Sequence, residues 1–121
     1  MIRVLIVEDS PVSADYLAHL FSKDPGVSII GIARDGREGI RMTERQKPDI
    51  VTMDINMPGM DGFEATREIM EKCPVPIVIV SSTFNAGDVN NSFKALQAGA
   101  LAILEKPPGI GHPAQEKYAK E

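Results

Sequence analysis

The chain has 121 residues, 13 of them basic and 17 acidic, so its formal net charge is −4. This length suits one domain, and the acidic balance argues against nucleic-acid or membrane binding through a basic surface. An apolar content of 43% is typical of a globular chain rather than a disordered one. The aliphatic runs are too short to span a bilayer, no signal-peptide pattern precedes the first strand, and one cysteine cannot form an internal disulfide. We therefore expect a cytoplasmic protein.

Short aliphatic strands alternate with amphipathic helices along the whole chain. The predicted strands are 2–7, 27–33, 50–53, 77–80 and 101–104. Helices are predicted after each of the first four strands, and a polar helix is expected to begin at Gln115. Regular alternation of this kind predicts a single doubly wound parallel sheet with right-handed crossovers.

The predicted helices have recognisable start signals and apolar faces. Ser10-Pro11 provides an N-cap with a first-turn proline, and Asp35 and Asp61 each precede a glutamate by three residues, as in a capping box. Gly99 closes the fourth helix. The apolar residues at helical spacing are Val12, Tyr16, Leu17, Leu20 and Phe21 in the first helix, and Val89, Phe93 and Leu96 in the fourth.

Reactive side chains follow four of the five predicted strands. They are Glu8 and Asp9, Asp54, Ser81 and Lys106. Because the carboxyl ends of parallel strands lie along one edge of the sheet, residues far apart in the sequence should converge there. A solvated aspartate at one strand end would be unremarkable, but an acid pair, an acid, a hydroxyl and a lysine together favour a functional site.

The chemistry of this group points to phosphoryl transfer. Two carboxylates about 5 Å apart repel by roughly 3 kcal/mol at an effective dielectric near 20, which favours a hard divalent cation such as Mg²⁺ or Mn²⁺. Lys106 and Ser81 could bind further phosphoryl oxygens. Asp54 would then be the nucleophile that forms an aspartyl phosphate.

Four motifs in this order resemble those of a response-regulator receiver domain. They are Ile6-Val7-Glu8-Asp9-Ser10, the stretch from Asp49 through Asp54 to Gly62, Val80-Ser81-Ser82, and Glu105-Lys106-Pro107. The resemblance covers residues 1 to about 108, and Val80-Ser81-Ser82 is most similar to the receiver of chemotaxis-type protein-glutamate methylesterases. It implies a flavodoxin-like (CheY-like) fold with five parallel strands in the order 2-1-3-4-5. It also implies phosphorylation by a sensor histidine kinase.

The resemblance implies a role for each matching residue. Asp54 is the expected phosphoacceptor and, with Asp9, an expected ligand of Mg²⁺ (or Mn²⁺). Glu8 is expected to reach the metal through water, and Asn56 through its backbone carbonyl. The hydroxyl of Ser81 would follow the phosphoryl group, with Lys106 as its counter-charge and a cis bond to Pro107.

Two positions depart from the family pattern. Glu8 replaces the commoner aspartate and lengthens the reach to the metal. Ile103, three residues before Lys106, stands where many receivers carry the aromatic residue that changes rotamer on activation. We therefore expect Ile103 to be packed inward already, and the response to lie in the loop after Ser81.

The sequence is expected to form one receiver domain over 1–121, with a short or truncated last helix, excised from a longer regulator. Its expected partners are the kinase and an output domain or downstream protein bound through the fourth-helix face, with no direct nucleic-acid or membrane binding.

An alternative is the regulatory part of a methylesterase, whose activity would lie elsewhere because no G-x-S-x-G elbow is present. A metal-dependent phosphatase is disfavoured by Asn56, where a second aspartate is usual. A degenerate receiver is disfavoured because every charged site residue is present. We expect this chain to catalyse at most its own phosphorylation and dephosphorylation.

Overall fold

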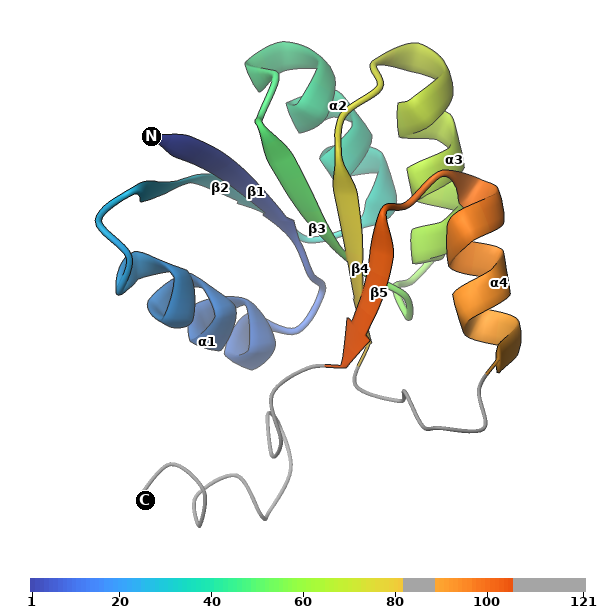
Figure 1. Cartoon of the computed structure of the whole chain (residues 1–121), viewed down its shortest axis with the longest axis horizontal. Helices are drawn as coiled ribbons and strands as arrows, with labels where there is room; N and C mark the ends of the chain where they lie inside the picture. Colours follow the sequence, from blue (N-terminus) through green and yellow to red (C-terminus); the bar gives the residue numbers. More distant parts are fainter. Residues whose placement is uncertain (82–88, 106–121) are drawn as a thin grey trace, which may run out of the picture.

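The computed structural model describes residues 1–81 and 89–105, which form a five-stranded parallel sheet (Figure 1). The strands are β1 (Ile2–Val7), β2 (Val27–Ala33), β3 (Ile50–Asp54), β4 (Ile77–Ser81) and β5 (Ala102–Glu105). The helices are α1 (Pro11–Ser22), α2 (Gly36–Gln46), α3 (Gly62–Lys72) and α4 (Val89–Ala98). The strand order β2-β1-β3-β4-β5 confirms the prediction. The helix predicted from Gln115 lies outside the described residues.

Each of the first three helices begins at the cap that the sequence predicts. The side chain of each cap residue accepts a hydrogen bond from the backbone N–H three residues later. Ser10 accepts from Ser13 at 3.3 Å, Asp35 from Glu38 at 2.8 Å and Asp61 from Glu64 at 2.8 Å. In the return bond of the capping box of α2, Glu38 accepts from the N–H of Arg34 instead of that of Asp35. These caps fix where each strand-to-helix connection ends.

The sheet separates two apolar layers, as Figure 1 shows with α1 on one face and α2, α3 and α4 on the other. Successive residues of β1 alternate between them: Leu5 and Val7 belong to the larger cluster with the three helices, while Val4 and Ile6 pack with Leu17 of α1. A strand covered on both faces is expected to be almost entirely aliphatic, and β1 is.

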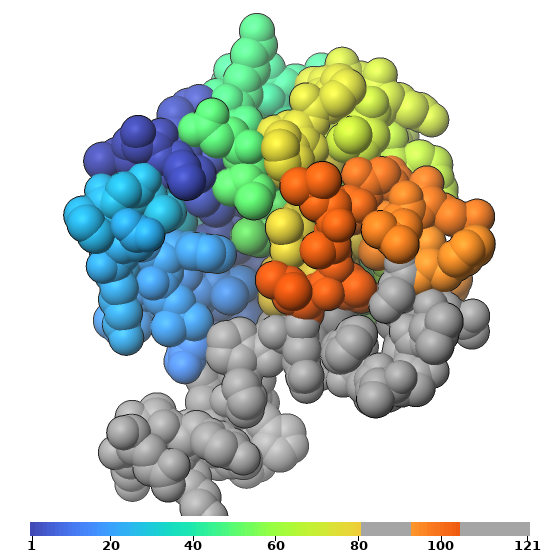
Figure 2. Space-filling model, in the orientation of Figure 1, coloured from blue at the N-terminus to red at the C-terminus, as the bar shows by residue number. Residues whose placement is uncertain are grey.

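The orientation of α4 differs from what its apolar pattern suggests. Phe93 and Leu96 are 60% and 62% exposed, whereas Ala95 and Ala98 are buried. The helix packs on α3 and β5 through small side chains, so its bulky apolar residues face outward. Figure 2 shows α4 and β5, in orange, forming one continuous surface. Val12, the first residue of the predicted α1 stripe, is likewise 60% exposed.

Among the described residues, no helix combines the length and the apolarity that a membrane span requires.

Candidate functional site

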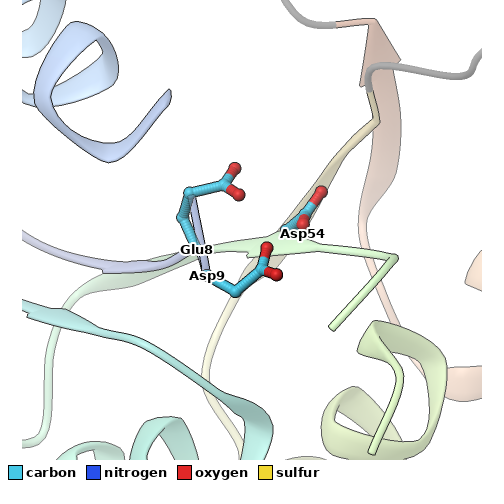
Figure 3. A group of neighbouring side chains, drawn as sticks. All are labelled: Glu8, Asp9 and Asp54. Carbon is cyan, nitrogen blue, oxygen red and sulfur yellow. The ribbon is translucent and has the colours of Figure 1, made fainter. Parts of the chain in front are cut away.

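Three carboxylates meet at the carboxyl edge of the sheet. Glu8 and Asp9 directly follow β1, and Asp54 is the last residue of β3, the strand paired with β1. Their side chains point toward one another in Figure 3, and one oxygen from each lies within 4.8 Å of the other two. Glu8 and Asp54 are 1% and 6% exposed, and Asp9 is half-buried. The predicted convergence of these three residues is therefore observed.

Backbone hydrogen bonds fix Glu8 at the junction of β1, β2 and α1. Its N–H donates to the carbonyl oxygen of Ala33, the last residue of β2, at 2.9 Å. Its Oε2 accepts from the N–H of Ser10, the N-cap of α1, at 3.2 Å. One oxygen of this buried carboxylate is thus hydrogen-bonded to the start of α1.

The loop after Asp54 folds back onto the end of β3. The N–H of Gly62 donates to the carbonyl oxygen of Ile55 at 2.8 Å, and Gly59 makes the turn with a φ of 83°. Met60 is buried against Gly36 at the start of α2. The loop that follows Asp54 is therefore held by the bond to Ile55 and by the packing of Met60 on Gly36.

The donor set fits a hard divalent cation. All three side chains offer carboxylate oxygens, which Mg²⁺ and Mn²⁺ prefer to nitrogen or sulfur. At such separations each pair of charges repels by roughly 3 kcal/mol at an effective dielectric near 20, and burial weakens the screening by water. Glu8, Asp9 and Asp54 could therefore hold such an ion, which would neutralise them.

Comparison with protein families identifies the family to which this acidic cluster belongs. The family model described as "Response regulator receiver domain" matches residues 4–112, nearly the whole chain. This chain is a receiver domain of the response-regulator family.

Within that family the similarity is to receivers of CheB-type methylesterases. The chain is 51% identical over 121 residues to protein-glutamate methylesterase/protein-glutamine glutaminase 2 of Methanospirillum hungatei, covering 100% of the chain and 35% of that protein. The corresponding protein of Nitrosospira multiformis is 48% identical over 121 residues, again 100% of the chain and 34% of the relative. The chain thus spans about a third of the length of these curated relatives.

A solved structure agrees with the sequence relatives. The response regulator domain of Thermotoga maritima CheB superposes with a TM-score of 0.86 at 35% identity, covering 99% of this chain and 89% of that one. The predicted resemblance to a methylesterase-type receiver is confirmed.

The structure places the remaining predicted residues of the receiver only in part. Ser81 is the last residue of β4, which pairs with β3, so its backbone lies at the same edge as Asp54. Asn56 lies two residues after Asp54 with an exposed side chain. Lys106 and its expected cis bond to Pro107 lie outside the described residues.

Sequence reasoning missed two residues that shape the receiver site. Ser10 was predicted only as a helix cap, yet its amide also binds Glu8. Gly62 was read as part of a capping box, yet its lack of a side chain lets α3 approach the backbone of Asp54. The only signal for the second was a glycine at the first position of a helix, where glycine lowers helix propensity.

Proposed function

We propose that Asp54 is the phosphoacceptor of a two-component phosphorelay and receives its phosphoryl group from a sensor histidine kinase. The observation that carries this proposal is the cluster of Glu8, Asp9 and Asp54 within 4.8 Å at the carboxyl edge of the sheet. Membership of the receiver family supports it. Side chains of Asp9 and Asp54 would hold Mg²⁺, with Glu8 acting through water and Asn56 through its backbone carbonyl.

The proposed step joins an oxygen of Asp54 to the phosphorus of the donor. The bond between phosphorus and the nitrogen of the donor histidine breaks, and that nitrogen keeps the electron pair, so no proton leaves the carboxylate. When bound, Mg²⁺ would neutralise charge on the carboxylates and the phosphoryl oxygens. The hydroxyl of Ser81 and the ammonium of Lys106 would each bind one phosphoryl oxygen.

The fold prepares Asp54 for this role by holding its backbone. Asp54 is the last residue of β3 and is 6% exposed, at the carboxyl edge of the sheet. The bond from Gly62 to Ile55 fixes the peptide that follows. Such positioning is most of what phosphoryl transfer requires from a protein.

We further propose that this chain is a single receiver domain that controls a methylesterase domain. The curated methylesterases that match it are about three times as long, and it aligns with about a third of each. The exposed apolar residues of the fourth-helix face offer a docking surface for that domain. They are Phe93 and Leu96 of α4, together with Leu101, which follows the helix.

Intact-mass measurement after incubation with acetyl phosphate and Mg²⁺ tests the phosphoacceptor. The wild-type chain should gain one phosphoryl group, and Asp54→Ala should gain none. Asp15→Asn, which removes an exposed carboxylate from α1, is the matched control and should be labelled like wild type. Labelling of Asp54→Ala to the wild-type extent would refute the assignment.

A further inference from the structure

Three of the six arginines of this acidic chain lie along one side of α2. Arg37, Arg41 and Arg45, called the arginine stripe below, are all exposed. Because they are four residues apart, they lie within about 80° of the helix circumference and about 6 Å apart along its axis. The face of α2 that packs on the sheet, with Gly39 and Ile40, lies on the other side of the helix.

The stability of α2 does not account for the arginine stripe. Arg37 and Arg41, and Arg41 and Arg45, are like-charged pairs at a spacing where side chains meet, which destabilises a helix. Arg37 lies in the first turn, at the unfavourable positive end of the helix dipole, and only Arg45, in the last turn, is favoured by the dipole. Among residues 1–80 and 93–104, whose side chains the structure describes, no carboxylate oxygen lies within 4.0 Å of these guanidinium groups. The three charges therefore face solvent without a partner in the described part of the chain.

The helix that carries the stripe is anchored at both ends. Asp35 caps its start. At its end, the guanidinium of Arg3 donates to the carbonyl oxygens of Lys47 at 2.8 Å and Gln46 at 2.9 Å. The three guanidinium groups thus project from a fixed support, which lowers the entropy lost when a partner binds.

We propose that the arginine stripe is a docking surface for an acidic helical segment of a partner protein. A guanidinium group matches a carboxylate in shape and can bind it through two parallel hydrogen bonds. Glutamates four residues apart on a helix repeat at the same spacing of about 6 Å, so one helix lying along α2 can pair with all three arginines.

The same features argue against other anionic partners. The net charge of −4 repels a nucleic acid as a whole, and α2 carries no aromatic residue on which a base could stack. The stripe also lacks the large apolar side chains that insert into a lipid surface.

This surface is separate from the fourth-helix face. Helix α3 lies between α2 and α4 and contacts both (Figure 1). A receiver that docks its output domain through α4 could therefore hold a second, acidic protein on α2 at the same time. The proposal does not depend on phosphorylation of Asp54.

Two synthetic peptides test the spacing. One is a capped alanine-rich helix with glutamates at three positions four residues apart, and the other is an isomer with the same glutamates distributed around the helix. Titration at low salt, followed through the arginine side-chain N–H signals, should move Arg37, Arg41 and Arg45. The first peptide should bind at least about fivefold more tightly than the isomer, and binding should weaken with salt. Equal affinity for the two peptides would overturn the proposal.

Charge reversal at the centre of the stripe provides the second test. Arg41→Glu should weaken binding of the first peptide roughly tenfold. It should leave the melting temperature nearly unchanged, because its new opposite-charge pairs with Arg37 and Arg45 offset its new like-charge pairs with Glu38 and Glu44. Arg67→Glu, the same change at an exposed site on α3, should bind like wild type. Equal losses of peptide affinity in the two variants would contradict the assigned partner. So would a single-stranded DNA oligonucleotide that displaces the bound peptide at a lower concentration than unlabelled peptide does.

Discussion

Gly62 lies against the main-chain carbonyl group of Asp54, with no space for a side chain between them. A Cβ atom at position 62 would overlap the carbonyl oxygen of Asp54 and come within 2.9 Å of its carbonyl carbon. The first residue of α3 is therefore in direct contact with the backbone that presents the proposed phosphoacceptor. Any group added there must displace either the helix or the end of β3.

Gly62→Ala is expected to destabilise the domain by about 2–4 kcal/mol, because the overlap is with backbone and cannot be relieved by a rotamer change. Gly59→Ala is the control: its φ of 83° disfavours alanine, but no atom lies within 4 Å of the added methyl group. The control should cost only about 1 kcal/mol. Urea unfolding measures both, and equal losses would show that α3 can shift away from Asp54.

The acidic cluster should respond differently to the loss of Asp9 and of Glu8. Asp9→Asn should raise the metal-free stability by about 1 kcal/mol, since it removes one repelling charge. It should also weaken Mg²⁺ binding more than Glu8→Gln does, because Oε2 of the buried Glu8 already accepts from the N–H of Ser10. Calorimetric Mg²⁺ titration of the two variants gives the order. The reverse order would contradict the water-mediated role proposed for Glu8.

Ile103 is expected to stay in place on activation. It is half-buried and packs against the main core, and a β-branched side chain has a restricted χ1 angle. NMR with and without beryllofluoride, a phosphoryl mimic, should show the largest shifts at Ser81–Val89 and an unchanged rotamer of Ile103. Most of that loop lies outside the described residues, so this response stays a prediction. A rotamer change at Ile103 as large as the loop response would rule it out.

Cys73 should be a poorly reactive thiol. Burial raises its pKa above the ordinary 9.0, the nearby Glu44 carboxylate adds to this rise, and Lys72 opposes it. Alkylation by iodoacetamide at pH 8 should be slower in the folded chain than in urea, because less thiolate is present. Because folding raises this pKa, the thiol does not make stability depend on pH below 9.0, the ordinary thiol pKa. As the pH rises past that value, the free energy of unfolding falls, because the thiol ionises more readily in the unfolded chain.

Two neutralising variants separate the two charges that act on Cys73. Glu44→Gln should lower the thiol pKa and speed alkylation, whereas Lys72→Gln should raise the pKa and slow it. Changes in the same direction in both variants would show that altered burial, and not charge, controls the thiol.

The outward orientation of α4 makes opposite predictions for neighbouring residues. Phe93→Ser should change the free energy of unfolding by no more than about 0.5 kcal/mol, because the ring is 60% exposed. Ala95→Leu should destabilise by about 1–3 kcal/mol, because it adds volume to a buried contact. Thermal unfolding of both variants decides, and a larger loss for Phe93→Ser would place the ring in the core.

Local sequence was enough to predict the elements, their order and the residues at the strand ends. Aliphatic runs such as that of β1 and capping residues such as Asp35 act over a few neighbouring positions, so they can be read locally. The rule that parallel strand ends share an edge was then enough to bring Glu8, Asp9 and Asp54 together.

Three features became clear only from the packing of the elements: which side of α4 is buried, how deep each carboxylate lies and why position 62 carries no side chain. Helical spacing shows that Phe93 and Leu96 share a face, but the space left by α3 and β5 admitted the alanine face instead. Glu8 lies deeper than its neighbour Asp9 because the ends of β2 and α1 close over it. These outcomes depend on distances between segments far apart in the chain, which local sequence does not specify.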